Sequence, residues 1–108
     1  QKNSNLDTAL QHAIQANQLS PNSSNILDTL GLALYSKGDY IAAKRAFSDA
    51  VSIQPSALNM QFHLAQSHVK VGETLQAGKI LEGLLNQQVP FSSRIAAQEL
   101  LDQLRAEL

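Results

Sequence analysis

The chain has no cysteine, so thiolate metal sites, thiol catalysis and disulfide bonds are all excluded. Charged residues make up only 16% of the 108 residues, and the net charge is −1. Because phosphate binding requires a concentrated basic face, this balance argues against nucleic acid as a main ligand. No apolar run approaches the roughly 18 residues of a membrane span. No signal peptide is visible either.

Residue patterns for catalysis or metal binding are also missing. His63 and His68 are five residues apart, about 140° around a helix, so they do not converge on one metal as residues at i and i+4 do. There is no glycine-rich phosphate loop and no local Ser/His/Asp signature. We therefore predict no enzyme, no cofactor and no metal site. Four glutamates on polar faces are interpreted as solvated charges: Glu73, Glu82, Glu99 and Glu107.

The chain contains a pattern of amphipathic helices. Residues 24–57 have the periodicity of two helices, broken at Gly38-Asp39 and closed by Pro55. Gly38 suits the left-handed position after a helix, and Asp39 suits the N-cap of the next one. Read through the chain, these signals predict helices at about 6–17, 23–36, 40–53, 58–70, 74–87 and 93–106, with residues 1–4 frayed and Asn5 capping the first helix.

The pattern repeats at a fixed interval along the chain. Gly31 and Ala65 are 34 residues apart (65 − 31), and so are Ala43 and Ala77 (77 − 43). Ala9 precedes Ala43 by the same 34 residues (43 − 9). A sustained period of this kind is the signature of a repeat architecture, in which each unit buries its apolar face against the next.

The chain resembles the tetratricopeptide repeat (TPR) family. The resemblance covers about residues 5–91 and rests on a Leu-Gly pair, alanines, an aromatic residue and a closing proline at the family's spacing. It implies an all-α fold, a right-handed α-solenoid of about six antiparallel helices. It also implies that ten residues pack the repeats: Leu30, Gly31, Ala43, Phe47, Ala50, Pro55, Leu64, Ala65, Ala77 and Leu81.

In this register the chain is one domain, residues 1–108. Residues 5–21 are expected to be the second helix of a truncated repeat, 24–57 and 58–91 two complete repeats, and 92–108 a C-terminal capping helix. The chain begins at Gln1 inside a repeat, so we expect a fragment of a longer array. The last helix has one apolar stripe: Ala97, Leu100, Leu101, Leu104 and Leu108.

Two glycines in the helix at 74–87 are unexpected, because each lowers the stability of a helix by about 1 kcal/mol. Gly78 and Gly83 indicate either the most flexible helix or a backbone pressed against its neighbour.

The TPR resemblance implies a groove that binds a peptide. In that family the first helix of each repeat lines the groove through its positions 2, 5, 9 and 12. Here these are Asn25, Asp28, Leu32, Tyr35, Asn59, Phe62, Gln66 and Val69. Their spacing places each set on one face of its helix. The apolar residues among them are not needed for the core stripes. Substituting Phe62→Ala together with Tyr35→Ala should therefore weaken binding without unfolding the chain. The competing interpretation is that Leu32, Tyr35 and Val69 merely pack helix against helix.

Some TPR domains hold a C-terminal carboxylate with Lys, Asn and Arg on their groove helices. Asp28, Leu32 and His63 stand at three of those positions here, so we do not expect an anionic tail as the ligand.

We therefore expect a scaffold that holds a protein or peptide partner. The alternative is a structural spacer that self-associates, in particular through the N-terminal end. A shorter resemblance, over residues 81–104, links the chain to bacterial multi-TPR lipoproteins of exosortase and exopolysaccharide systems. It implies a periplasmic or envelope location and a role in assembly.

Overall fold

The computed structural model describes residues 4–107, which form six α-helices and no β-strand. The prediction of an all-α fold with about six helices is therefore confirmed. The handedness and curvature of a solenoid stay predictions. The helices are α1 (Ser4–Leu19), α2 (Ser24–Ser36), α3 (Tyr40–Ile53), α4 (Leu58–Lys70), α5 (Thr74–Asn86) and α6 (Arg94–Ala106).

Two turns built in the same way reverse the chain after α2 and after α4. Gly38 and Gly72 both have positive φ, +87° and +85°, where a side chain would be strained. After α2, the Gly38 amide donates to the carbonyl of Tyr35 (3.0 Å) and the Asp39 amide donates to that of Leu34 (2.9 Å). The same two bonds recur at the equivalent positions after α4. These Schellman motifs confirm the left-handed positions predicted after these helices.

Side-chain caps fix the starts of α2 and α3. The Ser23 hydroxyl accepts a hydrogen bond from the amide of Ile26, and the Asp39 carboxylate accepts one from the amide of Ala42, both at 3.3 Å. Glu73 occupies the equivalent N-cap of α5, but its side chain makes no capping bond. Its carboxylate is instead directed to other helices, as described below.

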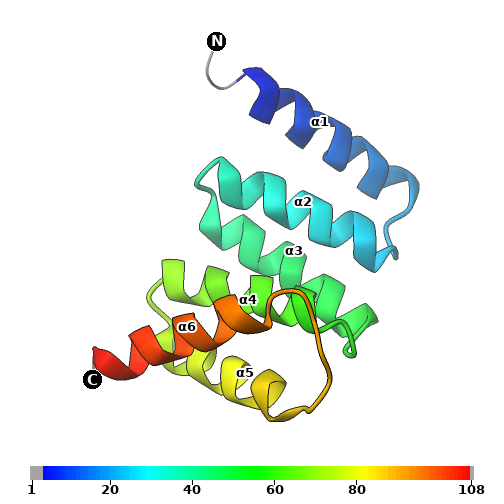
Figure 1. The fold of residues 1–108 in the computed structure, drawn as a ribbon. Helices are drawn as coiled ribbons and strands as arrows, with labels where there is room; N and C mark the ends of the chain where they lie inside the picture. Colours follow the sequence, from blue (N-terminus) through cyan, green and yellow to red (C-terminus); the bar gives the residue numbers. More distant parts are fainter. Residues whose placement is uncertain (1–3, 108) are drawn as a thin grey trace.

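The helices stack in chain order, and each packs mainly against its sequence neighbours (Figure 1). Figure 1 shows α1 at one end of the stack and α5 with α6 at the other. The largest core cluster lies among α4, α5 and α6 and includes Phe62, Leu81 and Leu101. Smaller clusters join α2, α3 and α4 around Ala50 and Phe47.

The Phe47 ring crosses α2 at Gly31. A Cβ atom added to Gly31 would lie 2.9 Å from Cζ of Phe47 and closer still to Cε1 and Cδ1, in a ring that is only 1% exposed. Gly31 therefore permits close helix packing, as the repeat register predicts. Gly78 and Gly83 differ, because a Cβ on either meets no atom within 4 Å. The interpretation that they press α5 against its neighbour is wrong.

Eight of the ten predicted repeat-packing residues are buried. Leu30 is half-buried, and Pro55 is exposed. Pro55 lies in the turn between α3 and α4, where its carbonyl accepts a hydrogen bond from the Gln61 side chain at 2.5 Å. The packing role predicted for Pro55 is therefore wrong: the residue lies beyond the end of α3, outside the core. The eight buried residues are Gly31, Ala43, Phe47, Ala50, Leu64, Ala65, Ala77 and Leu81.

The first helix is longer than predicted. α1 runs from Ser4 to Leu19, so Asn5 lies inside it and does not cap it. Within α1, Ala13 is buried and Ala9 is exposed, because α2 is the described helix that covers α1. The fraying expected of residues 1–3, like the contribution of Leu108 to the last stripe, lies outside the described residues.

None of the described helices combines the length and apolar character that crossing a membrane requires.

Candidate functional site

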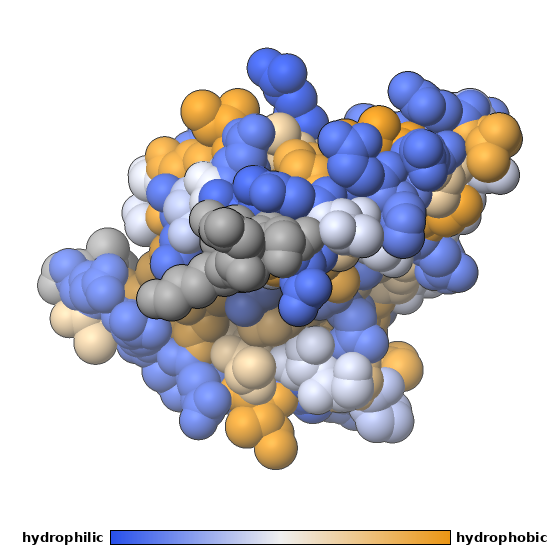
Figure 2. Space-filling model, turned by 90° about the horizontal axis from the view of Figure 1, so that it is seen from above, coloured by the Kyte–Doolittle hydropathy of each residue, from blue (hydrophilic) through white to orange (hydrophobic). Residues whose placement is uncertain are grey.

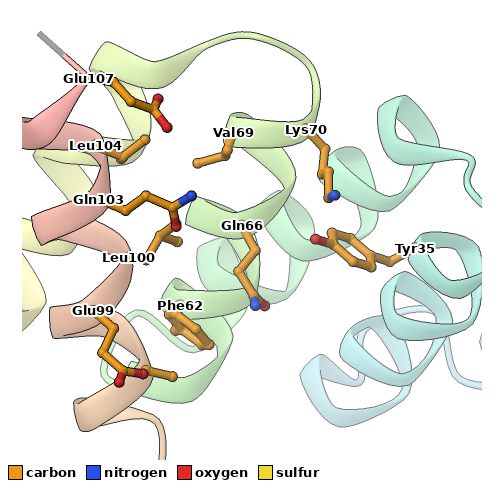
Figure 3. A pocket seen from close by; sticks show the side chains of 11 residues that line it. Tyr35, Phe62, Gln66, Val69, Lys70, Glu99, Leu100, Gln103, Leu104 and Glu107 are labelled. Atoms are coloured by element: carbon orange, nitrogen blue, oxygen red, sulfur yellow. The ribbon is translucent and has the colours of Figure 1, made fainter.

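Four of the eight predicted groove residues line one hollow, which we call the α4–α6 hollow. Tyr35 comes from α2, and Phe62, Gln66 and Val69 come from α4. The opposite wall is formed by α6, and the volume is about 380 Å³. Figure 3 shows the α4 and α6 side chains facing one another across this space, with Tyr35 at its far edge. The full lining is Tyr35, Phe62, Gln66, Val69, Lys70, Ala96, Glu99, Leu100, Gln103, Leu104 and Glu107.

The floor of the α4–α6 hollow is apolar. Phe62 and Leu104 are 6% and 9% exposed, and Val69 and Leu100 are half-buried beside them. Phe62 belongs to the core cluster of α4, α5 and α6. The prediction that the core does not need it is wrong, and truncating it is expected to destabilise the fold by about 3–5 kcal/mol. Binding tests at this hollow therefore need other residues.

Amide side chains line both walls of the hollow. Gln66 on α4 and Gln103 on α6 project into the space from opposite sides (Figure 3). Within residues 4–107, neither amide has a hydrogen-bond partner. Each offers a carbonyl acceptor and two N–H donors, the groups that a peptide backbone can use.

Tyr35 lines the hollow on the side of α2 and packs against Tyr40, the first residue of α3. The Tyr35 ring meets the Tyr40 ring edge-on, with 5.1 Å between centroids, and the Lys70 ammonium lies 5.5 Å from the Tyr40 centroid. Burial, with a smaller contribution from Tyr40, raises the pKa of the Tyr35 hydroxyl above its usual value of 10.0. Tyr35 is therefore neutral at pH 7 and available as a hydrogen-bond donor or acceptor.

Two carboxylates line the α6 wall. Glu99 lies on α6, and Glu107 is its C-cap. Both are exposed, and in the described part of the chain neither forms an ion pair or a hydrogen bond through its carboxylate. The basic residue in the last turn of α6, Arg105, pairs with Glu82 at 3.2 Å outside this hollow. The α6 wall therefore carries unbalanced negative charge.

Three other predicted groove residues line a second hollow of about 500 Å³, which we call the α2–α4 hollow. Asn25 is exposed there, but the other two are engaged within the fold. The carboxylate of Asp28 is 2.8 Å from Nδ1 of His63, and Oδ1 of Asn59 accepts a hydrogen bond from the amide of Ser93 (3.1 Å). Asp28 and Asn59 therefore hold helices together.

Leu32, the eighth predicted groove residue, lines neither hollow and is 41% exposed.

The residues of α6 that face the α4–α6 hollow were missed from the sequence. Because residues 92–108 were predicted to be a capping helix, the groove positions were assigned only up to residue 91. Positions 2, 5, 9 and 12 of a third repeat frame are Ser93, Ala96, Leu100 and Gln103. Three of these four line the hollow, so the repeat register itself held the missing signal.

Arg94, the first residue of α6, contacts the end of α5. Its guanidinium donates to the carbonyls of Leu85 (2.9 Å) and Gln87 (3.1 Å), at the C-terminal end of α5, and lies 5.6 Å from the Phe91 ring. A cation at this end of a helix satisfies carbonyls that have no partner inside it. Arg94 thus holds α6 against α5, which positions the α6 wall.

Glu73 is not a free solvated charge, in contrast to the prediction. Its carboxylate accepts hydrogen bonds from the Lys44 ammonium and from Nδ1 of His68, both at 2.8 Å. These bonds, the Lys44 bond first, hold the pKa of Glu73 below its usual value of 4.5. The group joins α3, α4 and the start of α5, and we call it the Glu73 clamp.

No three histidine, cysteine, aspartate or glutamate side chains gather into a metal site anywhere in residues 4–107. Among known proteins, no protein-family model and no curated sequence matches the chain. The TPR resemblance therefore rests on the residues and their register alone.

Proposed function

We propose that this chain is a TPR-type binding module that holds a short segment of a partner protein in the α4–α6 hollow. The single observation that carries the proposal is the convergence of Tyr35, Gln66 and Val69 with α6 around one hollow. These residues occupy the positions that line the groove in the family it resembles. The competing interpretation as helix packing concerns Leu32, Tyr35 and Val69, and it does not account for the two amide side chains, Gln66 and Gln103, that line the same hollow.

The dimensions and chemistry of the hollow favour a peptide over a folded surface. Its volume of about 380 Å³ is at the lower end of ligand sites and accommodates a few side chains. The parts of Phe62 and Leu104 that face the hollow can contact one apolar side chain of the peptide. Such an anchor, seated in a pocket, supplies much of the binding energy in complexes of this kind. Gln66 and Gln103 then provide hydrogen bonds to the backbone on either side of the anchor.

The test is an unbiased peptide-display selection against the chain, with Gln66→Ala/Gln103→Ala as the counter-screen. Both substitutions favour helix and remove no core atom. If each amide contributes about 1 kcal/mol, the double variant loses about 2 kcal/mol, roughly thirtyfold in affinity. The matched control is Gln98→Ala, because Gln98 lies on α6 outside the hollow, bonded to Asp102 at 3.0 Å.

Enriched peptides that bind the Gln98→Ala variant and lose affinity for the double variant support the proposal. No enrichment, or enrichment that ignores the double variant, contradicts it. Circular dichroism of each variant verifies that the helices are intact.

Self-association is the second candidate, and a third hollow favours it. This hollow, about 310 Å³, lies between α5 and α6 and is lined by Leu75, Gly78, Leu101 and Leu104. Leu75 is 68% exposed there. The opposite end offers less: Figure 2, which looks onto the α1 end, shows apolar side chains separated by hydrophilic ones over the coloured surface. Contact between copies is therefore best sought at α5 and α6.

Sedimentation velocity across a hundredfold concentration range tests this alternative. A dimer that Leu75→Glu dissociates supports it. A monomer at every concentration contradicts it.

A further inference from the structure

We infer that the partner segment is a cationic, extended peptide with the pattern basic–x–apolar–x–basic. Its two basic residues are at positions i and i+4, and an apolar residue lies midway between them. This inference rests on the proposed function and identifies the chemistry of its partner. It follows from the charge of the α6 wall and from the distance between its two carboxylates.

The charge of the hollow is unequal on its two sides. Glu99 and Glu107 line the α6 wall without a partner in residues 4–107. The one basic residue in the lining, Lys70, lies on the opposite side, where its ammonium is placed over the Tyr40 ring. Because two carboxylates line the α6 wall and the one ammonium group lies on the opposite side, a cationic segment next to α6 is electrostatically complementary.

The spacing of the carboxylates sets the spacing of the basic residues. Glu99 and Glu107 are eight residues apart along α6, which corresponds to about 12 Å. Figure 3 shows them at opposite ends of the wall, with Leu100, Gln103 and Leu104 between them. An extended peptide advances about 3.3 Å per residue and turns alternate side chains to the same side. Residues at i and i+4 therefore reach both carboxylates, and residue i+2 faces the apolar floor.

The probe is the capped peptide acetyl-Gly-Arg-Ser-Leu-Ser-Arg-Gly-amide, titrated into the ¹⁵N-labelled chain and followed by NMR. Three matched peptides are compared with it. One has glutamine in place of both arginines, one has serine in place of leucine, and one has the two arginines adjacent. NMR detects millimolar affinities and locates the bound surface by its shifted amides.

The inference predicts shifts at Gln66, Glu99 and Gln103. Exposed ion pairs are weak, so we expect about a threefold loss of affinity for each one removed and about a tenfold loss for both. The glutamine peptide should show this loss on the unchanged protein. Glu99→Gln/Glu107→Gln should show it with the arginine peptide. The matched control for either single substitution, Asp102→Asn, removes one negative charge from α6 outside the hollow and should bind as the unchanged chain does.

Charge reversal gives a gain-of-binding test. A peptide with glutamate in place of arginine should bind Glu99→Lys/Glu107→Lys more tightly than it binds the unchanged chain. On the unchanged chain, raising the ionic strength should weaken the binding of the arginine-containing peptides and leave that of the glutamine peptide nearly constant, because salt screens exposed ion pairs.

Failure of the inference is distinct from failure of the proposed function. If the arginine and glutamine peptides shift the same amides with equal affinity, the hollow binds peptides but the cationic inference falls. Spermine, a polyamine without a peptide backbone, is titrated for comparison. If spermine or the leucine-free peptide binds as tightly as the probe, the hollow recognises positive charge alone, and this also overturns the inference. If no peptide shifts these amides and display selection enriches none, the proposed function falls as well.

Discussion

At the residue scale, Gly31 is the one glycine of the five whose absent Cβ would meet another residue, the ring of Phe47. The Phe47 ring occupies the position that a Cβ on Gly31 would need, and it is enclosed among Ala43, Leu64 and their neighbours. A ring that is 1% exposed has little room to move. The two residues should therefore behave as an energetically coupled pair.

We predict that Gly31→Ala lowers the free energy of unfolding. Alanine favours helix over glycine by about 1 kcal/mol, but overpacking a core costs about 1–3 kcal/mol, and the added methyl group requires the ring to move. The expected net loss is about 1–2 kcal/mol, measured by urea denaturation followed by circular dichroism. In the Phe47→Leu background the added methyl group should cost less, giving a measurable coupling energy. A chain as stable as the original after Gly31→Ala contradicts this account of the contact.

Gly78 and Gly83 should respond in the opposite direction. Neither has an atom near its absent Cβ, and both lie within α5. Replacing either by alanine adds helix propensity without a clash, so each substitution should raise the free energy of unfolding by about 1 kcal/mol. The same urea titration measures the gain. Loss of stability in either variant would show that a close contact limits the site.

The sequence distinguished these glycines only in part. Gly31 recurs in register with Ala65 and sits opposite an aromatic position, so its role followed from the repeat. Gly78 and Gly83 have no such counterpart, and the face of α5 on which each lies depends on how the helix rotates against α6. Helix propensity is local, whereas that rotation results from packing, which the sequence does not display directly.

At the element scale, the two repeats use equivalent positions in different ways. Asp39 caps α3, whereas Glu73, at the same position of the next repeat, joins Lys44 and His68. The extra methylene of glutamate carries its carboxylate beyond the local backbone. The sequence predicted the turn at both places because Gly38 and Gly72 recur. It did not predict the clamp, because Lys44 comes from a helix one repeat earlier.

We predict that the Glu73 clamp makes stability depend on pH. Its pKa is lower in the folded chain than the usual 4.5, mainly because of the hydrogen bond from Lys44. The stabilisation is therefore fully present above pH 4.5 and disappears as the pH falls through the folded-state value. Glu73→Gln should lower the melting temperature at pH 7, and the difference from the original chain should vanish at lower pH.

The control for this titration is Glu99→Gln, which removes a carboxylate without a partner in residues 4–107. Differential scanning calorimetry from pH 7 to pH 3 should show a pH-dependent difference for Glu73→Gln and a nearly constant one for Glu99→Gln. A Glu73→Gln difference that is the same at every pH contradicts the clamp.

In the candidate site, too, features that depend on local sequence were predictable, whereas features that depend on packing between helices were not. Tyr35, Gln66 and Val69 were predicted because position in the repeat fixes the helix face. Asp28 and Asn59 share that face, but they bond to His63 and Ser93 on neighbouring segments. Which polar residues of a face remain free depends on the distances between helices, and these arise only when the repeats pack.

At the scale of the whole molecule, stabilising contacts are unevenly distributed along the stack. The largest core cluster lies among α4, α5 and α6, with Leu81 and Leu84 fully buried. Among residues 5–19 of α1, Ala13 alone is buried, and α2 is the neighbour that covers this helix. Because stability in such a stack depends mainly on contacts between neighbours, local unfolding should differ between the two ends.

We predict that native-state hydrogen exchange resolves this gradient. Amides in the middle of α1, such as those of Ala13 and Ile14, should exchange through local opening and show the smallest protection of any helix centre. Amides at the centres of α4 and α5, such as those of Ala65 and Leu81, should exchange only through global unfolding. Low urea concentrations should accelerate the second group far more than the first, because global unfolding exposes more surface. Equal protection and equal urea dependence in α1 and α5 would mean that the six helices unfold as one cooperative unit. In that case the contacts between α1 and α2 carry far more stability than their burial suggests.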